Sequence, residues 1–322
     1  DVIPSAIHLS ALLDIEESLC PSLVGLQKSL EDKAEEFMPI IKTGRTHLMD
    51  ATPIRLGQEF EGYAGLIERS LDRLLLIKDE LSLLALGGTA VGTGVNTHPK
   101  FSMIACQHIT KFAGVEVYET DNHFLAQSSL DGALTASSAL RGLAVNMQKI
   151  ASDLRLLGSG PRSGIGEIAL PAVQPGSSIM PGKVNPVICE SAIQVCAQVI
   201  ANDTAIMLGG LGSIFELNLM LPLIAHNMLF SIEILSNSID VFCKKLLLDL
   251  KADIDKCENY IEGSLAMCTT LAPVIGYDKA TEIAYEAYKK NKTIREVLIS
   301  KNILSDEEIK RLLDPIKMIK PK

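Results

Sequence analysis

The sequence has 322 residues, enough for one large domain or two, and its 47% hydrophobic content and mean hydropathy of +0.24 exclude an intrinsically disordered chain. The formal net charge of −9, with no cluster of Lys and Arg, argues against a nucleic-acid-binding surface, and it means that an anionic substrate would need a local positive site. Aromatic residues make up only 4% of the chain and Trp is absent. Leu, Ile and Ala therefore carry the apolar content, which is typical of helices packed on helices.

The seven cysteines are an odd number, and they form no CxxC pair and no interleaved pattern with His. We therefore expect reduced thiols in an intracellular compartment and no metal site. No run of about 18 residues is apolar without a charge or a Gly, so we expect no transmembrane helix and no membrane partner. The sequence opens on Asp1 rather than Met, so a targeting peptide is neither visible nor excluded. We expect a cytoplasmic protein, and a mitochondrial location stays open.

Helices are predicted wherever apolar residues recur at alternating steps of three and four, because this spacing buries one helix face. The nearly heptad period of these stripes favours a bundle with small crossing angles. By themselves the stripes indicate a core and no chemistry. In chain order they are Leu23, Leu26, Leu30, Ala34, Phe37 and Ile41; Leu140, Leu143, Met147, Ile150, Leu154 and Leu157; Ile193, Cys196, Ile200 and Met207; and Met228, Ile232, Leu235, Ile239, Phe242 and Leu246.

From about residue 250 the chain changes character, because charge rises and the segments read as short amphipathic helices. Ser305, followed by three acidic residues, is predicted to be a helix N-cap. We therefore predict an all-α fold in two parts. A central long-helix bundle over residues 1–249 carries the functional loops, and a small C-terminal helical domain covers residues 250–322.

Long irregular loops are predicted between the helices, and loops of this length favour a functional role. In PGSSIMPGKVNP, residues 175–186, two Gly and three Pro require a backbone that bends and can approach a ligand closely. This segment presents Ser177, Lys183 and Asn185. Surface solvation is the plain interpretation, and a mobile flap that grips an anion is the alternative. The predicted loops cover residues 42–57, 87–100, 158–186 and 209–222.

The other loops also carry polar groups. Thr46 and His47 lie in the first; a lone His is more often a structural hydrogen bonder than a catalyst, yet it titrates nearest to neutral pH. The glycines of residues 87–101 are spaced GxxxGxG, which is not the dinucleotide fingerprint, so an exposed turn is favoured over a phosphate-binding loop. Glu216 and Asn218 interrupt apolar surroundings, and a solvated turn and a functional loop are both open interpretations.

Five segments together resemble the signatures of class II fumarases, in the fumarase/aspartase superfamily. They are GRTHLMDATP, GGTAVGTGVNTHPKF, SGPRSGIGEI, GSSIMPGKVNP and FELN, and the similarity covers essentially the whole chain. The GSSxMPxKxN pattern is shared with aspartases, argininosuccinate lyases and adenylosuccinate lyases, so subfamily markers decide more. Aspartases resemble GRTQ, NTPKE and MPAKVN where this chain has GRTH, NTHPK and MPGKVN.

The resemblance implies a fumarate hydratase of the tricarboxylic acid cycle, which adds water to fumarate to give (S)-malate without a metal or organic cofactor. It implies Ser177 as the base that takes a proton from carbon. It also implies His47, oriented by Glu190, as the acid–base partner for the hydroxyl or water. For Glu190 the alternative is a carboxylate that only favours a helix N-terminus.

Substrate binding is implied for Thr46, Lys183 and Asn185. Loss of the carbon-bound proton gives a dianionic aci-carboxylate intermediate, which water stabilises poorly. A cation, an amide and a hydroxyl near that carboxylate would offset the added charge. A serine base also needs nearby N–H groups or positive charge to stabilise its alkoxide.

The family assembles as a homotetramer whose sites draw residues from several subunits, so the resemblance implies the same assembly here. The family's longer N-terminal region, with a substrate-contacting loop, is absent from this sequence, so either a longer protein supplies it or the chain cannot complete the family's site alone. Two alternatives are an aspartate ammonia-lyase and a non-catalytic scaffold of the same fold. The three subfamily markers disfavour the first, and retention of the whole residue set disfavours the second.

Overall fold

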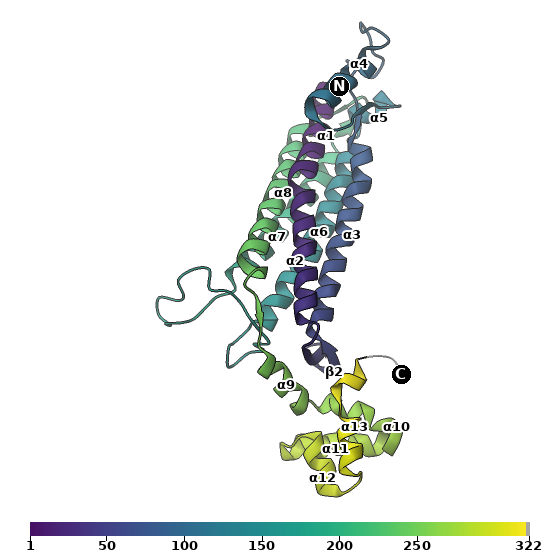
Figure 1. Ribbon diagram of the computed structural model, residues 1–322. Helices are drawn as coiled ribbons and strands as arrows, with labels where there is room; N and C mark the ends of the chain where they lie inside the picture. The colour runs from purple at the N-terminus through teal and green to yellow at the C-terminus, as the bar shows by residue number, and fades with distance from the viewer. Residues whose placement is uncertain (320–322) are drawn as a thin grey trace. The chain divides into compact units, whose positions relative to one another are not determined.

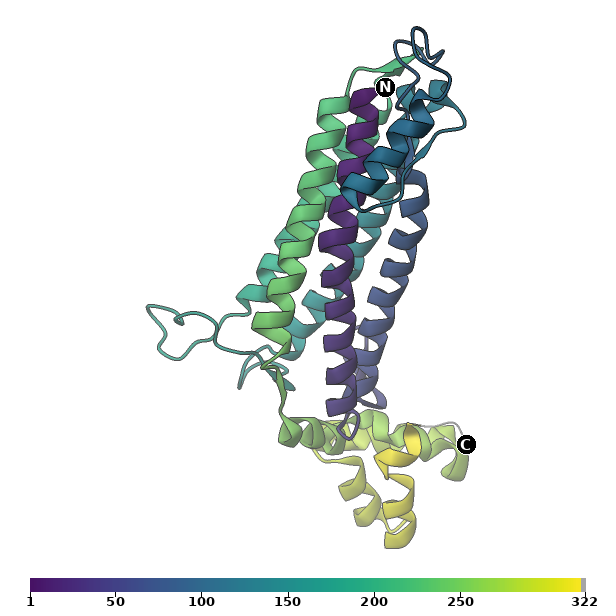
Figure 2. The same cartoon turned by 45° about the horizontal axis from the view of Figure 1, so that its top comes forward.

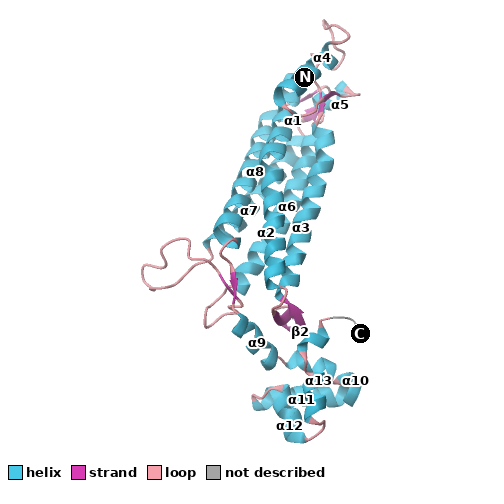
Figure 3. Ribbon diagram, viewed as in Figure 1, coloured by secondary structure: helices cyan, strands magenta, loops and turns pink. Residues whose placement is uncertain are grey.

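The computed structural model describes residues 1–319, and helices account for most of it (Figures 1 and 3). The strands are short, the longest having seven residues, and the described residues form four two-stranded pairings. The all-α prediction is thereby confirmed. The chain divides into two compact units. Unit 1 comprises Asp1–Ser29, Tyr63–Arg155 and Pro171–Asp249, and unit 2 comprises Leu30–Gly62, Leu156–Leu170 and Leu250–Lys322.

Unit 1 is built mainly from long helices, of which α2, α3 and α6 also have residues in unit 2. Its elements are α1 (Val2–Asp14), the π-helical turn η1 (Ile15–Leu19), α2 (Cys20–Phe37), α3 (Leu56–Leu81), β3 (Leu83–Leu84), α4 (Phe101–Ala113), β4 (Tyr118–Glu119), α5 (His123–Ser128), α6 (Asp131–Leu157), α7 (Val187–Gly210), β6 (Ser213–Ile214), β7 (Leu217–Asn218), α8 (Leu221–Phe242) and the π-helical turn η2 (Cys243–Leu247). Strands β3 and β4 pair in parallel, and β6 and β7 form a hairpin.

Helix α8 has neighbours on two sides within unit 1, since both α7 and α1 pack along it (Figures 1 and 2). Helices α3 and α6 are joined by Asn146, whose amide donates to the Ser70 hydroxyl at 2.9 Å and to the Leu66 carbonyl at 3.3 Å. The bundle is therefore fixed by buried apolar faces and by a few polar contacts between helices.

The predicted stripes on α2, α6 and α8 are confirmed as buried faces. Ile41 belongs to a strand, whereas the other five residues of the first stripe are buried on α2: Leu23, Leu26, Leu30, Ala34 and Phe37. The helix ends two residues before Pro39, because the residue ahead of a proline disfavours helical geometry. The extension of this stripe to Ile41 was wrong.

The predicted stripe on α7 was also wrong in register, since Met207 is exposed and only Cys196 of the four residues is buried. The buried face carries Asn202 and Asp203 among apolar residues. Their side chains bond inside the bundle, Asn202 donating to Ser231 and Asp203 accepting from Ser137. Hydropathy misplaced the face because α7 is apolar on most sides while polar residues lie on its buried side.

Among the described helices, α7 alone is long and apolar enough to cross a membrane by length and composition. One such helix is weak evidence, because helices of packed cores pass the same test. Here α7 packs along α8, and Asp203 also accepts from Arg141 at 2.8 Å. The absence of a membrane partner stays a prediction.

Unit 2 contains a β-hairpin, a second strand pair and the small C-terminal helices. Its further elements are β1 (Ile41–Thr46), β2 (Met49–Arg55), β5 (Ile168–Ala169), β8 (Lys251–Ala252), α9 (Ile254–Gly263), the 3₁₀ turn η3 (Leu265–Thr270), α10 (Ala272–Ile275), α11 (Tyr277–Lys290), α12 (Ile294–Lys301), α13 (Asp306–Leu312) and the 3₁₀ turn η4 (Pro315–Met318). Apolar residues of α9 to α13, with Ile41, form one buried cluster. The predicted division at residue 250 stays a prediction.

The C-terminal helices begin and end at residues suited to these positions. Ser305 is the N-cap of α13, as predicted, and forms a capping box with Glu308. Thr293 and Glu296 form the same motif on α12. Local sequence therefore determines where these short helices start.

The prediction of a loop over residues 42–57 was wrong, because β1 and β2 pair here and α3 begins at Leu56. The sequence did not predict this hairpin, because its two-residue turn, His47 and Leu48, lacks the Asn-Gly or Asp-Gly sequence that normally marks such turns. Both residues have left-handed φ angles, 55° and 61°. The predicted loops at 87–100 and 158–186 remain irregular apart from β5.

Gly57 allows α3 to approach α2 within unit 2, and this contact makes a prediction. A Cβ on Gly57 would lie 2.4 Å from the Ala34 carbonyl oxygen and 2.6 Å from the Met38 nitrogen. Both are backbone atoms, which cannot easily shift to make room for a side chain. Gly57→Ala should therefore lower the free energy of unfolding by about 1–3 kcal/mol, although Ala is the better helix former.

The matched control is Gly62→Ala in the same helix, where an added Cβ meets nothing within 4 Å. This variant should stabilise the chain by up to about 1 kcal/mol. Chemical unfolding curves measured side by side distinguish the two. Equal effects of the two substitutions would contradict the close contact.

Candidate active site

The loop between β5 and α7 carries Ser177, Lys183 and Asn185 on an irregular backbone, as the sequence predicted. The Ser177 hydroxyl oxygen accepts hydrogen bonds from the backbone N–H groups of Ile179, at 3.3 Å, and Met180, at 3.2 Å. Two N–H groups directed at one hydroxyl oxygen are the arrangement that stabilises negative charge on it.

The same loop folds back on itself at Gly176. A Cβ at this position would lie 2.5 Å from the Lys183 carbonyl oxygen, so only glycine fits. Gly182 has a left-handed φ of 78°, which glycine adopts without strain. The two glycines therefore bring the backbones of Ser177 and Lys183 close together.

The polar groups of this loop are open to solvent. Lys183 is exposed, Asn185 is partly buried, and no ion pair to Lys183 occurs among the described residues. Glu190 lies in the first turn of α7 and is partly buried. Unit 1 thus places four of the six predicted site residues on one stretch of chain, 177–190.

Thr46 and His47 lie in unit 2 at the end of the β1–β2 hairpin. Thr46 pairs with Met49 across the strands, and His47 and Leu48 form the turn. Both His47 and Thr46 are exposed. Two successive non-glycine residues in left-handed conformation are uncommon, and such strain concentrates at functional sites. His47 and Glu190 belong to different units, so their pairing stays a prediction, as do all six roles.

Sequence reasoning missed a buried charge cluster behind the hairpin. The Glu167 carboxylate has 0% exposure and Lys42 has 1%. Arg45 donates to both Glu167 oxygens, at 2.8 and 2.9 Å, and the Lys42 ammonium lies 2.9 Å from Oε2. Lys42 also donates to Glu59, at 2.9 and 3.0 Å. The available signal was that Arg45 and Glu167 both stand inside polar motifs, GRTH and GIGEI, without an assigned role.

The cluster contains two cations and two carboxylates, so its charges balance. Burial alone would lower the pKa of Arg45, but the hydrogen bonds and attraction from Glu167, with the charges of Asp50 and Glu59, outweigh it and raise this pKa. Burial raises the pKa of Glu59, against the opposing effect of Lys42. Arg45 therefore stays charged beside its carboxylate.

Backbone and aromatic contacts fix the cluster within unit 2. The Glu167 N–H donates to the Leu157 carbonyl at 2.9 Å, and the Glu167 carbonyl accepts from the Asp253 N–H at 2.8 Å. The Arg45 guanidinium lies over the Tyr260 ring at 5.7 Å, and the Tyr260 hydroxyl donates to the Ile165 carbonyl at 2.9 Å. Three separate segments therefore meet around one carboxylate.

The remaining polar loops have structural roles. The Asp1 carboxylate accepts from the N–H groups of Gly87 and Thr89, both at 3.0 Å, and so holds the start of the glycine-rich loop. Asn218 is buried, donating to the Gly209 carbonyl and accepting from the Met220 N–H. The interpretation as a solvated turn holds for Glu216, which is exposed, and is wrong for Asn218.

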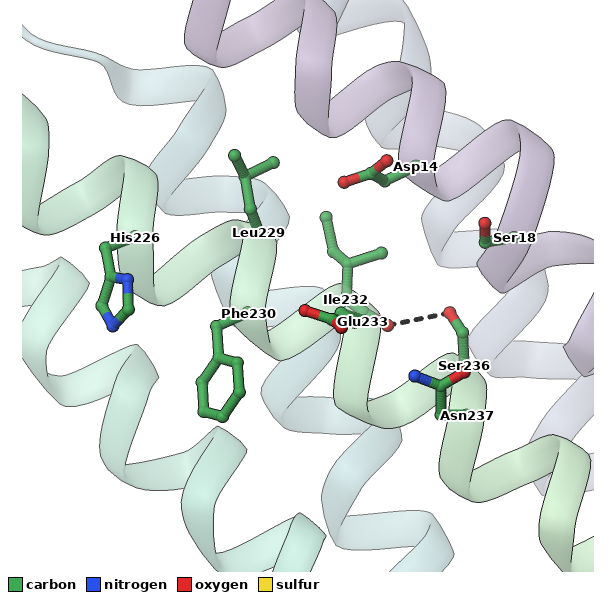
Figure 4. Close-up of a pocket in the computed structure, with 9 residues that line it drawn as sticks. All are labelled: Asp14, Ser18, His226, Leu229, Phe230, Ile232, Glu233, Ser236 and Asn237. Atoms are coloured by element: carbon green, nitrogen blue, oxygen red, sulfur yellow. Dashed lines mark hydrogen bonds between the residues drawn. The ribbon is translucent and has the colours of Figure 1, made fainter.

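A pocket of about 460 Å³ in unit 1 lies between the α1–η1 segment and α8 and contains none of the predicted site residues (Figure 4). Asp14 and Glu233 contribute carboxylates, and burial, with the charges of Glu17 and Glu233, raises the pKa of Asp14. A dicarboxylate would be repelled here, so the pocket is a poor substrate site. Its lining residues are Asp14, Ser18, His226, Leu229, Phe230, Ile232, Glu233, Ser236 and Asn237.

No group of three or more His, Cys, Asp or Glu within residues 1–319 is placed to hold a metal ion. All seven cysteines, each within this range, are free. Burial raises the pKa of Cys189, next to Glu190, to about 12, so this thiol is protonated and unreactive near neutral pH.

Comparison with known proteins shows which families and solved structures this chain is similar to. Residues 1–201 match the family described as "Lyase", and residues 267–320 match the family described as "Fumarase C C-terminus". A class II fumarate hydratase of Halobacterium salinarum is 50% identical over 315 residues, which are 98% of this chain and 67% of that protein.

Two crystal structures share the fold with a TM-score of 0.95. One is a class II fumarase from Schistosoma mansoni, 36% identical, with 99% of this chain and 70% of that one covered. The other is a "fumarate lyase:delta crystallin" from Brucella melitensis, 42% identical, with 100% and 69% covered. The protein is thus a lyase by fold and sequence. More closely, the chain belongs to the class II fumarate hydratase family, which confirms the resemblance and the long-helix bundle.

The charge cluster predicts a large cost for removing one of its cations. Lys42→Met leaves Glu167 and Glu59 with one fewer positive partner inside unit 2. We expect the free energy of unfolding to fall by about 3–5 kcal/mol, the usual loss when a buried ion pair is broken. Denaturant unfolding near pH 7 measures this change.

The control is Arg295→Met, which breaks a two-bond Arg–Glu pair with Glu262 on the surface of the same unit. Solvent screens this pair, so the loss should be about 0–1 kcal/mol. A Lys42→Met loss no larger than that of the control would contradict the proposed importance of the buried cluster.

Proposed function

We propose that this chain is a hydro-lyase that catalyses the reversible hydration of fumarate to (S)-malate. The observation that carries this proposal is 50% identity over 98% of the chain to a protein named fumarate hydratase class II. The reaction needs proton transfers and stabilisation of negative charge, and the polar loops contain residues suited to both. It requires no metal or organic cofactor.

Ser177 is proposed to remove the proton from the carbon next to a carboxylate. Serine is a weak base unless its alkoxide is stabilised. The N–H groups of Ile179 and Met180 on its oxygen support this role. Lys183 lies on the same folded loop, its backbone close to Gly176, and would supply positive charge.

Lys183, Asn185 and Thr46 are proposed to bind the dicarboxylate and its aci-carboxylate intermediate. Lys183 supplies a local cation that the chain's net charge of −9 makes necessary. The exposure of Lys183 and the partial burial of Asn185 leave both available to a ligand.

His47 is proposed to exchange a proton with the hydroxyl or water, with Glu190 setting its orientation. Its position in a strained, exposed turn supports a functional role over a packing one. Positioned proton transfer of this kind contributes about 10²–10⁴ in rate.

We further propose that the chain acts in the tricarboxylic acid cycle in the cytoplasm, as a homotetramer whose sites combine residues of several subunits. Exposed apolar residues on α7, α8 and their connecting hairpin support association, since large exposed apolar areas favour interfaces. They include Met207, Leu208, Leu211, Ile214, Phe215, Leu217 and Leu219.

A spectrophotometric assay tests the proposed reaction. Protein added to malate, without metal and without ammonia, should produce the ultraviolet absorbance of fumarate. Production of fumarate from aspartate and not from malate would indicate an aspartate ammonia-lyase. A folded, assembled and inactive protein would indicate the scaffold function.

Ser177→Ala should reduce kcat by about 10²–10⁴-fold, because the proposed base is lost. The loop makes few packing contacts, so assembly and the unfolding midpoint should be unchanged. Ser178→Ala, at the exposed neighbouring serine, is the control and should retain kcat within about tenfold. Near-normal turnover of Ser177→Ala would remove Ser177 from the base role.

His47→Asn should lower kcat by at least about tenfold, because acid–base assistance is lost while the left-handed turn is retained. The pH dependence of kcat should also change, because the acid–base group is lost. His108→Asn, at an exposed histidine of α4, is the control. An unchanged pH–rate profile in His47→Asn would contradict the assignment.

A further inference from the structure

The turn that carries His47 has little packing of its own to hold it. Leu48 is 72% exposed, and both turn residues keep left-handed φ angles that non-glycine residues rarely adopt. The position of His47 must therefore be determined by β1 and β2, which flank the turn, and above all by the strand residues nearest to His47.

Arg45 is the last residue before Thr46 and His47 that has a rigid partner. Both of its terminal nitrogens bond to Glu167, one to each carboxylate oxygen, at 2.8 and 2.9 Å. A two-bond guanidinium–carboxylate pair fixes direction as well as distance. The orientation of strand β1 at the turn is thus tied to the position of Glu167.

Lys42 and Arg45 both reach Glu167 although they lie three residues apart on β1. On a regular strand such residues point to opposite faces, so the strand departs from regular geometry between them. The register shifts between Thr43 and Arg45, where two residues of β2 oppose Gly44 of β1 in a β-bulge. At the bulge, Gly44 has no room for a side chain, since a Cβ would lie 2.7 Å from the Thr52 carbonyl oxygen.

Glu167 itself is held firmly. Its N–H and carbonyl groups bond to Leu157 and Asp253, at 2.9 and 2.8 Å, and β5, which follows it directly, pairs with β8. The buried carboxylate is therefore a fixed point. Lys42 and Arg45 attach one strand of the hairpin to it.

We propose that Glu167 is a positioning residue, which acts through Arg45 and Lys42 to hold the hairpin turn so that Thr46 and His47 meet the substrate. This inference rests on the proposed function, because it assumes that His47 takes part in the hydration reaction. It adds a residue whose contribution is orientation rather than contact with the reacting atoms.

Arg45→Lys tests the proposal, because it keeps the charge beside Glu167 and removes the two-bond geometry. We expect kcat to fall by about 10–100-fold, as a displaced catalytic group would cause. KM should rise by a smaller factor than kcat falls, because Thr46 is displaced together with His47 while Lys183 and Asn185, on another loop, still bind the substrate. Amide hydrogen exchange in residues 41–55 should accelerate by about tenfold as the hairpin loosens.

Arg295→Lys is the matched control, since it alters a two-bond Arg–Glu pair in the same unit whose bonds join Arg295 to Glu262 and not to a residue of the hairpin. It should change neither kcat nor hairpin exchange by more than about twofold. If Arg45→Lys does not fold, Glu167→Asp replaces it, because this change keeps the charge balance and withdraws the carboxylate by one methylene.

The proposal requires a lower kcat together with faster hairpin exchange. Unchanged kcat, unchanged exchange, or a proportionate rise in KM would each overturn it. Inactivity of the unaltered protein toward fumarate and malate would instead refute the proposed function. The exchange comparison would then still decide whether the Arg45–Glu167 pair holds the turn.

Discussion

A carboxylate without exposed surface is stable only beside positive charge and hydrogen-bond donors, and Glu167 obtains both from a single strand. Arg45 and Lys42 reach it together although they lie three residues apart on β1, beside a bulge that places two residues of β2 opposite Gly44. The hairpin, the segment around residue 167 and the start of α9 are thereby joined in unit 2. This arrangement explains why GRTH and GIGEI, which are distant in sequence, both carry charged residues.

The candidate chemistry lies on irregular or strained backbone, whereas the helices supply rigid support. The loop 175–186 closes through Gly176 and Gly182 and directs two N–H groups at Ser177. A helix could not offer these groups, because its N–H groups beyond the first turn are already bonded. Unit 1 thus holds a folded loop with two N–H groups directed at Ser177, and unit 2 holds a strained turn with an exposed imidazole.

Polar residues inside the bundle show why apolar periodicity has limits. Asn202 and Asp203 lie on the buried side of α7, where Ser231, Ser137 and Arg141 satisfy them. When a helix is apolar on most sides, its hydropathy does not show which face is buried. In α7 the buried face is identified by these polar pairs. The stripes on α6 and α8 were readable because apolar residues are more strongly concentrated on one side of these helices than on one side of α7.

The sequence by itself determined the helical class, the stripes of α6 and α8, the N-cap at Ser305 and the family, because these depend on local periodicity, local capping or contiguous motifs. It also identified the loop of Ser177 from glycine and proline spacing. Only the tertiary structure decided that residues 41–55 form a hairpin, that α7 buries its polar side, and that Glu167 joins Lys42 and Arg45. The physical reason is that these features arise from contacts between residues distant in the sequence, at least 29 positions apart on α7 and 122 for Arg45 and Glu167, or from pairing that no local preference encodes.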